Sequence, residues 1–216
     1  MIKTKKKDIL LTLFLLVFFT HVALAEITGS AHDLSGAGYG SNEICIFCHT
    51  PHNGVSEVDG KTYGVHLWNH EITSATYTLY NSPTLDATME QPGGVSKLCL
   101  SCHDGTIAID SFGGNSGTNY MSGSKAVGRN SDLSDDHPVG FRWEHQTNPE
   151  CTTACHFGGP TGDPYSYEVR FYNHRMECST CHDPHNNGPE GGSGDNPMLR
   201  MTMNGSALCL LCHNRK

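Results

Sequence analysis

Residues 45–53 read CIFCHTPHN, and residues 178–186 repeat the pattern as CSTCHDPHN. Each copy has two cysteines separated by two residues, a histidine directly after the second cysteine, and another histidine three residues further on. The C-x-x-C-H unit is the attachment signature of c-type haem. In that chemistry the two thiols add to the porphyrin vinyl groups, and the adjacent imidazole becomes the proximal iron ligand.

All ten cysteines of the 216-residue chain follow this arrangement. Four motifs have the C-x-x-C-H spacing, and a fifth has one additional residue between its cysteines. The motifs are CIFCH (45–49), CLSCH (99–103), CTTACH (151–156), CSTCH (178–182) and CLLCH (209–213). We therefore predict five covalently bound haem c groups. The predicted thioether residues are Cys45, Cys48, Cys99, Cys102, Cys151, Cys155, Cys178, Cys181, Cys209 and Cys212, and the proximal ligands are His49, His103, His156, His182 and His213.

Two other uses of paired cysteines compete with this interpretation. C-x-x-C pairs build structural zinc sites, and disulfides are common in exported proteins. Zinc does not require a histidine directly after the second cysteine of every pair. Disulfides within C-x-x-C units are usually redox-active, and five of them in one chain would be unusual. The repeated histidine favours haem over both.

The composition indicates that something other than aliphatic side chains fills the interior, and the predicted fold depends on this. Leu, Ile, Val and Phe are sparse after residue 25, whereas the chain holds 24 glycines. Large apolar haem discs can replace an aliphatic core. We expect mostly irregular coil with short helices wrapped around the haems, and little or no sheet. The Gly/Ser/Asn-rich stretches 111–136 and 186–197 are predicted to be loops that act only as spacers.

The N-terminus has the pattern of a secretory signal. Four lysines precede an apolar run over residues 9–19, and Ala23-Leu24-Ala25 forms a small-residue cleavage site. The run is too short to span a membrane, which takes about 20 apolar residues. We predict a signal peptide over 1–25 and one cytochrome domain over 26–216. Loss of four lysines and one aspartate changes the formal charge from −8 to −11, which disfavours nucleic-acid binding.

Eight further histidines remain after residue 25 for the distal sides of five irons, so bis-histidine ligation of every iron is expected. Candidates for the distal ligands are His32, His52, His70, His137, His145, His174 and His185, while His66 is predicted to be a surface residue. In C-H-x-P-H, the second histidine cannot reach the far face of its own haem, so we expect it to bind a neighbouring one. Methionines 198, 201 and 203 are a less favoured ligand source. The pairing of donors with haems stays open.

A second repeat supports an internal duplication. LCLSCH at 98–103 returns as LCLLCH at 208–213, so the halves run roughly over 26–110 and 137–216, with the motif at 151–156 inserted. No histidine lies between His185 and Cys209. The C-terminal haem therefore needs a distal ligand from far back in this chain or from another chain.

Together these motifs resemble the doubled-CXXCH multihaem cytochromes c of metal- and sulfur-reducing bacteria. The similarity runs through EICIFCHTPHN (43–53), PGGVSKLCLSCHDGTIAID (92–110), MECSTCHDPHN (176–186) and GSALCLLCHN (205–214). It is closest to small extracellular members whose subunits polymerise into haem-lined filaments. Those members carry four haems in this pattern, and this chain adds the CTTACH motif. The resemblance implies that a histidine of one subunit can ligate a haem of the next, with His52 or His32 as the candidate.

We expect electron transfer along closely spaced haems, as a subunit of an extracellular conductive filament. The alternative is a monomeric periplasmic electron shuttle, and a multihaem reductase is less favoured because surplus histidines leave no open iron. We expect no enzymatic activity. The expected partners are redox proteins or extracellular acceptors and further copies of this chain, with no nucleic acid and no membrane span in the mature chain.

Overall fold

The computed structural model describes residues 27–62, 64–143, 169, 171–172, 175–186, 198–210 and 212–213. The predicted signal peptide, the third motif at 151–156, the donors His145 and His174, and nearly all of the predicted loop at 186–197 lie outside these residues. Four of the five predicted attachment motifs lie inside them.

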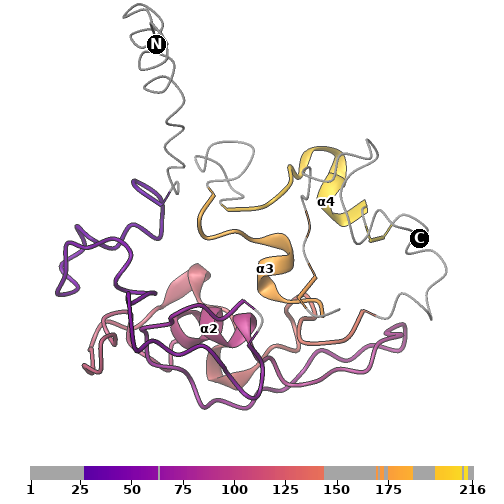
Figure 1. Ribbon diagram of the computed structural model, residues 1–216. Helices are drawn as coiled ribbons and strands as arrows, with labels where there is room; N and C mark the ends of the chain where they lie inside the picture. Colours follow the sequence, from indigo (N-terminus) through magenta and orange to yellow (C-terminus); the bar gives the residue numbers. More distant parts are fainter. Residues whose placement is uncertain are drawn as a thin grey trace, which may run out of the picture.

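Regular structure is confined to short helices joined by long irregular segments (Figure 1). In chain order these are α2 (Val95–His103), η1 (Gly123–Lys125), η2 (Arg129–Ser131), α3 (Cys178–Cys181), η4 (Asn204–Ser206) and α4 (Ala207–Leu210). Pairing between extended segments within the described ranges is limited to isolated bridges, such as Val55 with Trp68. The prediction of mostly coil with short helices and little or no sheet is confirmed for the described residues.

Helix α2 is the longest element and lies between two small apolar clusters. It starts after Gly94, whose φ of 52° suits glycine, and Asp104 ends it with its N–H bonded to the Leu100 carbonyl. Leu98 packs with Val58 and Val65. Leu100 packs with Tyr77 and Leu133. These clusters hold the second motif in place, but neither is large enough to be the core of a domain of this size.

Helix α3 packs directly against α2 (Figure 1). A capping box between Glu177 and Thr180 begins α3. The buried Ser96 hydroxyl of α2 donates to the Glu177 carboxylate and accepts the Cys178 N–H at 2.9 Å. This shared polar contact fixes the second and fourth motifs against each other.

The segment 111–136 differs from the prediction of a plain spacer. It contains η1 and η2, and the carboxylate of Asp110 orders it by accepting the backbone N–H groups of Thr118 and Asn119 at 3.0 and 2.9 Å. Its chain also returns to α2, where the Val127 N–H donates to the His103 carbonyl at 2.8 Å. The prediction overlooked that such a loop can support a ligand.

Within the described ranges, no helix has the length and apolar character needed to cross a membrane.

Candidate functional site

Each described attachment motif forms a single helical turn or ends a helix. The N–H groups of His49 and His213 bond to the carbonyls of Cys45 and Cys209 at 2.8 Å, and that of His182 bonds to Cys178 at 3.1 Å. Residues three apart in such a turn share a face. The two thiols of a motif therefore lie on one side, with the histidine directly after them, as attachment along one porphyrin edge requires.

The thiols do not form either of the competing structures. None of the eight described cysteines takes part in a disulfide. No group of three or more His, Cys, Asp or Glu side chains among the described residues is arranged to hold a metal ion. Burial, followed by the nearby Cys45, raises the pKa of the Cys48 thiol to about 11. Burial also raises the pKa of Cys102 to about 12.

Thiols of different motifs lie close to one another around α3. Cys99 and Cys178 lie close enough that each affects the pKa of the other: Cys178 raises the pKa of Cys99, and Cys99 lowers that of Cys178. The pKa of Cys181 is raised by burial first and then by the proximity of Cys178 and Cys209. The fourth motif thus has neighbouring thiols from both the second and the fifth motifs.

The first motif is anchored by the segment that pairs with it. Phe47 is buried and packs edge-on against Phe112, with ring centres 4.7 Å apart. Asn69 donates its side-chain amide to the Ile46 carbonyl at 2.6 Å. The His49 Nδ1 lies 2.7 Å from the His66 carbonyl oxygen. That contact fixes the ring orientation and leaves Nε2 available to a metal.

The second motif histidine is oriented in the same way by the 111–136 segment. The His103 Nδ1 lies 2.8 Å from the carbonyl oxygen of Lys125, at the end of η1. No pattern in the sequence marks this support, because any residue supplies a carbonyl. The same holds for His66, whose exposed side chain agrees with its prediction as a surface residue but whose carbonyl supports His49.

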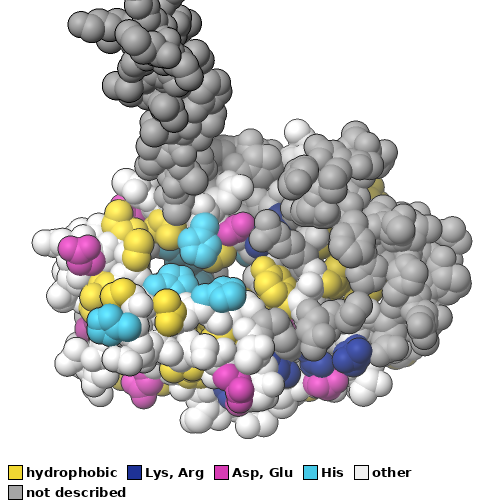
Figure 2. Space-filling model, viewed as in Figure 1, with side chains coloured by type: hydrophobic (Ala, Val, Ile, Leu, Met, Phe, Trp, Pro, Cys, Tyr) yellow, Lys and Arg dark blue, Asp and Glu magenta, His cyan; other side chains and the backbone are white. Residues whose placement is uncertain are grey.

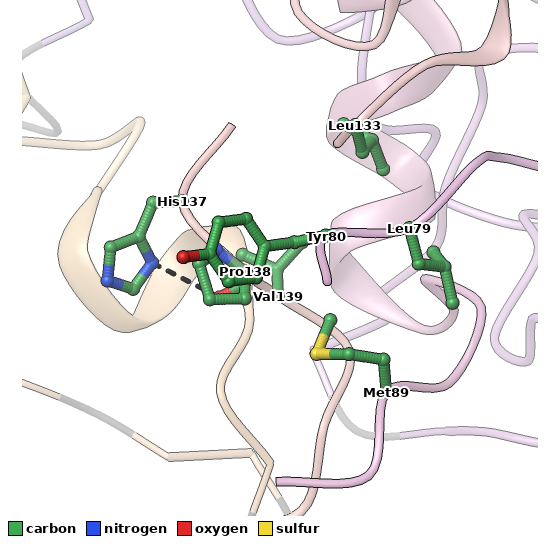
Figure 3. Close-up of a pocket in the computed structure, with 7 residues that line it drawn as sticks. All are labelled: Leu79, Tyr80, Met89, Leu133, His137, Pro138 and Val139. Carbon is green, nitrogen blue, oxygen red and sulfur yellow. Dashed lines mark hydrogen bonds between the residues drawn. The ribbon is translucent and has the colours of Figure 1, made fainter. Parts of the chain in front are cut away.

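His137 lies at the edge of a small pocket that is otherwise lined largely by apolar side chains such as Leu79, Met89 and Leu133 (Figure 3). Its Nδ1 donates to the carbonyl of Pro138 at 3.1 Å, drawn as the dashed line. Its ring centre is 6.4 Å from that of His213, the proximal histidine of the last motif.

His32 carries an unpartnered buried nitrogen. Its Nδ1 is buried with no hydrogen-bond partner, an arrangement that ordinarily costs free energy. Burial, together with the nearby His103, His185 and His182, lowers the pKa of His32 to about 4. The ring is therefore uncharged at neutral pH, the form in which imidazole binds metals. Its centre is 6.1 Å from that of His103.

His185, in the second C-H-x-P-H unit, lies beside the first motif. Its ring centre is 6.0 Å from that of His49, with 21° between the planes. Asp183 supports it, because one carboxylate oxygen accepts the His185 backbone N–H at 3.1 Å. Arg200 holds the other carboxylate oxygen at 2.8 Å and donates to the Ser179 carbonyl. Figure 2 shows histidine side chains gathered around a hollow on one face of the molecule.

The remaining candidates are not brought to a motif histidine by any contact of the described residues. His52 is exposed, with its Nδ1 3.3 Å from the Asn53 amide. His70 is buried, with Nδ1 2.8 Å from the Glu71 carbonyl and Nε2 3.0 Å from the Ala108 carbonyl. Met198 is buried, and methionines 201 and 203 are half-buried. The His70 Nε2 also lies 3.4 Å from the Cys102 Sγ, so His70 contacts a cysteine of the second motif.

These residues fit covalently attached haem. The two cysteines of each described motif lie three residues apart at a helical turn, the Nδ1 atoms of His49 and His103 are held by carbonyls, and His32 has a buried nitrogen with no partner. Haem would be held at Cys45/Cys48, Cys99/Cys102, Cys178/Cys181 and Cys209/Cys212.

The comparisons with known proteins agree with this chemistry over part of the chain. A family model described as a doubled CXXCH motif matches residues 173–216, which contain the fourth and fifth motifs. No curated protein matches the chain significantly. The family match indicates covalently bound c-type haem and supports a multihaem c-type cytochrome of electron transfer.

Proposed function

We propose that residues 26–216 form an exported pentahaem cytochrome c that transfers single electrons between closely spaced haems and has no enzymatic activity of its own. The observation that supports it best is the packing of α3 against α2, fixed by the hydrogen bonds of Ser96 to Glu177 and Cys178. The two helices carry attachment motifs that are far apart in sequence. Haems attached to them would lie close together.

The chain's contribution is to hold and shield the cofactors. Bound haem supplies one-electron exchange at iron. The Ser96–Glu177 contact sets the separation of the second and fourth motifs. Carbonyls of His66 and Lys125 orient two proximal rings, and such outer contacts adjust the basicity of the ligating nitrogen. No step in this scheme requires an acid or base to act on a substrate.

Intact mass and pulsed reduction of the purified secreted protein test this proposal. We expect a mass equal to the polypeptide from Glu26 plus five haems. After partial reduction, the electrons should redistribute among the haems at a rate independent of protein concentration. A bare polypeptide mass would contradict haem attachment. A redistribution rate proportional to protein concentration would contradict transfer within one molecule.

We further propose assembly into an extracellular filament, which rests on the family resemblance and on His52. This histidine is exposed in a C-H-x-P-H unit, whereas its counterpart His185 lies beside His49. His52 is therefore the residue best placed to reach a haem of another copy. The proximity of His137 to His213 supplies a donor for the C-terminal haem within the same chain, so that haem does not need a second subunit.

Gel filtration and electron microscopy separate the filament from a monomeric periplasmic shuttle. A filament should be shortened or lost in His52→Ala and retained in His66→Ala, a second exposed histidine. A wild-type protein that is strictly monomeric, with every iron six-coordinate, favours the shuttle. A high-spin signal in the resting wild-type spectrum would instead favour the reductase alternative, because catalysis needs an open iron position.

A further inference from the structure

We propose that three pairs of histidines are the axial ligand pairs of three haems: His49 with His185, His103 with His32, and His213 with His137. The proposal rests on the proposed function, since it requires haem at these motifs. It assigns a distal ligand to the first, second and fifth motifs, all from the same chain.

The distances between the rings are those of two imidazoles on opposite sides of one metal. The three separations between ring centres are 6.0, 6.1 and 6.4 Å. A bond between a metal and an imidazole nitrogen is about 2 Å long, and two such bonds plus the half-widths of the rings give about 6 Å. The three pairs agree with this separation within a few tenths of an ångström.

The composition of the pairs argues against ordinary ring contacts. Among the described histidines, each of these pairs joins one motif histidine to one histidine outside the proximal position. The donors come from the N-terminal segment, from the 137–141 segment and from the second C-H-x-P-H unit. If these ring contacts arose only from packing, we would not expect all three to join a motif histidine to a histidine outside the proximal position.

Hydrogen bonds at the outer nitrogens leave the inner ones available. Nδ1 of His49, His103 and His137 each faces a backbone carbonyl oxygen, at 2.7, 2.8 and 3.1 Å. A neutral imidazole has one N–H, so donation from Nδ1 leaves the lone pair on Nε2. Metal-ligating histidines are oriented in this way by an outer acceptor. At least one ring of every pair is therefore set for ligation through Nε2.

The ring planes predict distinct spectra for the three sites. The planes of His49 and His185 are 21° apart, whereas those of His103 with His32 and His213 with His137 are 85° and 77° apart. Nearly parallel axial imidazoles split the iron d orbitals that receive their π density, which gives a rhombic low-spin signal. Nearly perpendicular imidazoles leave those orbitals close in energy, which gives a strongly anisotropic signal.

The test is electron paramagnetic resonance of the oxidised holoprotein, with haem content measured by intact mass. His185→Gly should lose one haem's rhombic low-spin signal and gain one high-spin haem, and added imidazole should restore the low-spin state. His32→Gly and His137→Gly should each lose one strongly anisotropic signal. Glu57→Gln is the control, since Glu57 is exposed and belongs to none of the three pairs, and its spectrum should equal wild type.

The outcomes distinguish a failure of this ligand assignment from a failure of the proposed electron-transfer function. A fully low-spin His185→Gly protein with unchanged haem content would overturn the assignment of His185 and leave the electron-transfer proposal intact. A wild-type mass without haem would remove the function itself. Should the glycine variant fail to fold, His185→Met keeps a sixth ligand and should raise one midpoint potential, because a thioether favours the reduced iron. An unchanged set of potentials in that variant would equally overturn the assignment.

Discussion

Asp104, the residue directly after His103, is the most heavily hydrogen-bonded side chain around α2. One carboxylate oxygen accepts the hydroxyls of Tyr77 and Thr73 at 2.6 and 2.9 Å. The other accepts the Thr106 N–H and hydroxyl, both at 2.7 Å. A buried carboxylate with this many donors fixes the chain at the point where the second motif ends.

Replacing Asp104 with alanine should therefore destabilise the holoprotein by about 3 kcal/mol, because buried donors lose their acceptor. Denaturant unfolding, followed by the haem visible spectrum, measures this change. Asp110→Ala is the control, since Asp110 also accepts several N–H groups but lies where water can replace it, and its effect should be clearly smaller. Equal effects of the two variants would contradict the role given to Asp104.

The hydrogen bond between Tyr77 and Asp104 makes the stability of the folded protein depend on pH in the alkaline range. Burial, then its hydrogen bond to Asp104 and the charge of that carboxylate, raise the pKa of Tyr77 far above its usual value of 10. The unfolded chain releases the phenol proton near pH 10, whereas the folded chain retains it to higher pH. The stabilising contribution is thus complete below pH 10 and declines as the pH rises above it. Stability measured from pH 8 to 12 should fall less steeply in Tyr77→Phe than in wild type.

At the scale of elements, the first motif depends on a close approach between two irregular segments. Val55 and Trp68 exchange backbone hydrogen bonds at 2.8 Å, and Leu67 has a φ of 48°, which is uncommon outside glycine. A Cβ on Gly54 would overlap backbone atoms of Leu67. The absence of a side chain at position 54 allows the His66 carbonyl to reach His49.

We expect Gly54→Ala to destabilise the holoprotein by about 1–3 kcal/mol, because backbone atoms must move to relieve the overlap. The spectrum of one haem should change as well, since the His66 carbonyl moves away from the His49 ring. Gly36→Ala is the matched control, because its Cβ would meet open space. Thermal melting and the visible spectrum of the two variants give the comparison, and identical results would show that the approach is not needed.

The coil-rich fold could be predicted from the sequence because it depends on composition: sparse Leu, Ile and Val indicate that helices will be short. Cysteine spacing predicts the attachment points, and these remain predictions. The supports of the ligands could not be predicted in this way. The supporting groups at His66 and Lys125 are backbone carbonyls, which every residue has, so no sequence pattern marks them. The pairing of His32 with His103 joins residues 71 positions apart and depends on how the intervening loops fold.

At the scale of the whole molecule, the described chain has too little aliphatic core to fold unaided. The larger clusters consist of Val58, Val65 and Leu98, and of Tyr77, Leu100 and Leu133, with a few partly buried neighbours. Burial of so few side chains does not offset the conformational entropy of a chain this long. We expect the proposed haems to supply the difference, as metals do in small domains.

Chain produced in cells without the haem-attachment machinery should consequently be unfolded and rapidly degraded. Limited proteolysis and circular dichroism of the colourless product, compared with the holoprotein, measure this. Replacement of all ten cysteines with serine should give the same result in competent cells. A compact, protease-resistant product in either case would show that the polypeptide has an independent core.

The position of α3 has a consequence for the routes that electrons would take between the proposed haems. Helix α3 packs against α2 beside the second motif, Cys209 contributes to the raised pKa of its second thiol, and the segment after it places the His185 ring 6.0 Å from that of His49. On the proposed haem attachment, the fourth site would adjoin three others and form a junction instead of one link in a line. In a branched network of this kind, losing the site at Cys178 and Cys181 should isolate its neighbours from one another, whereas losing a peripheral site removes only one branch.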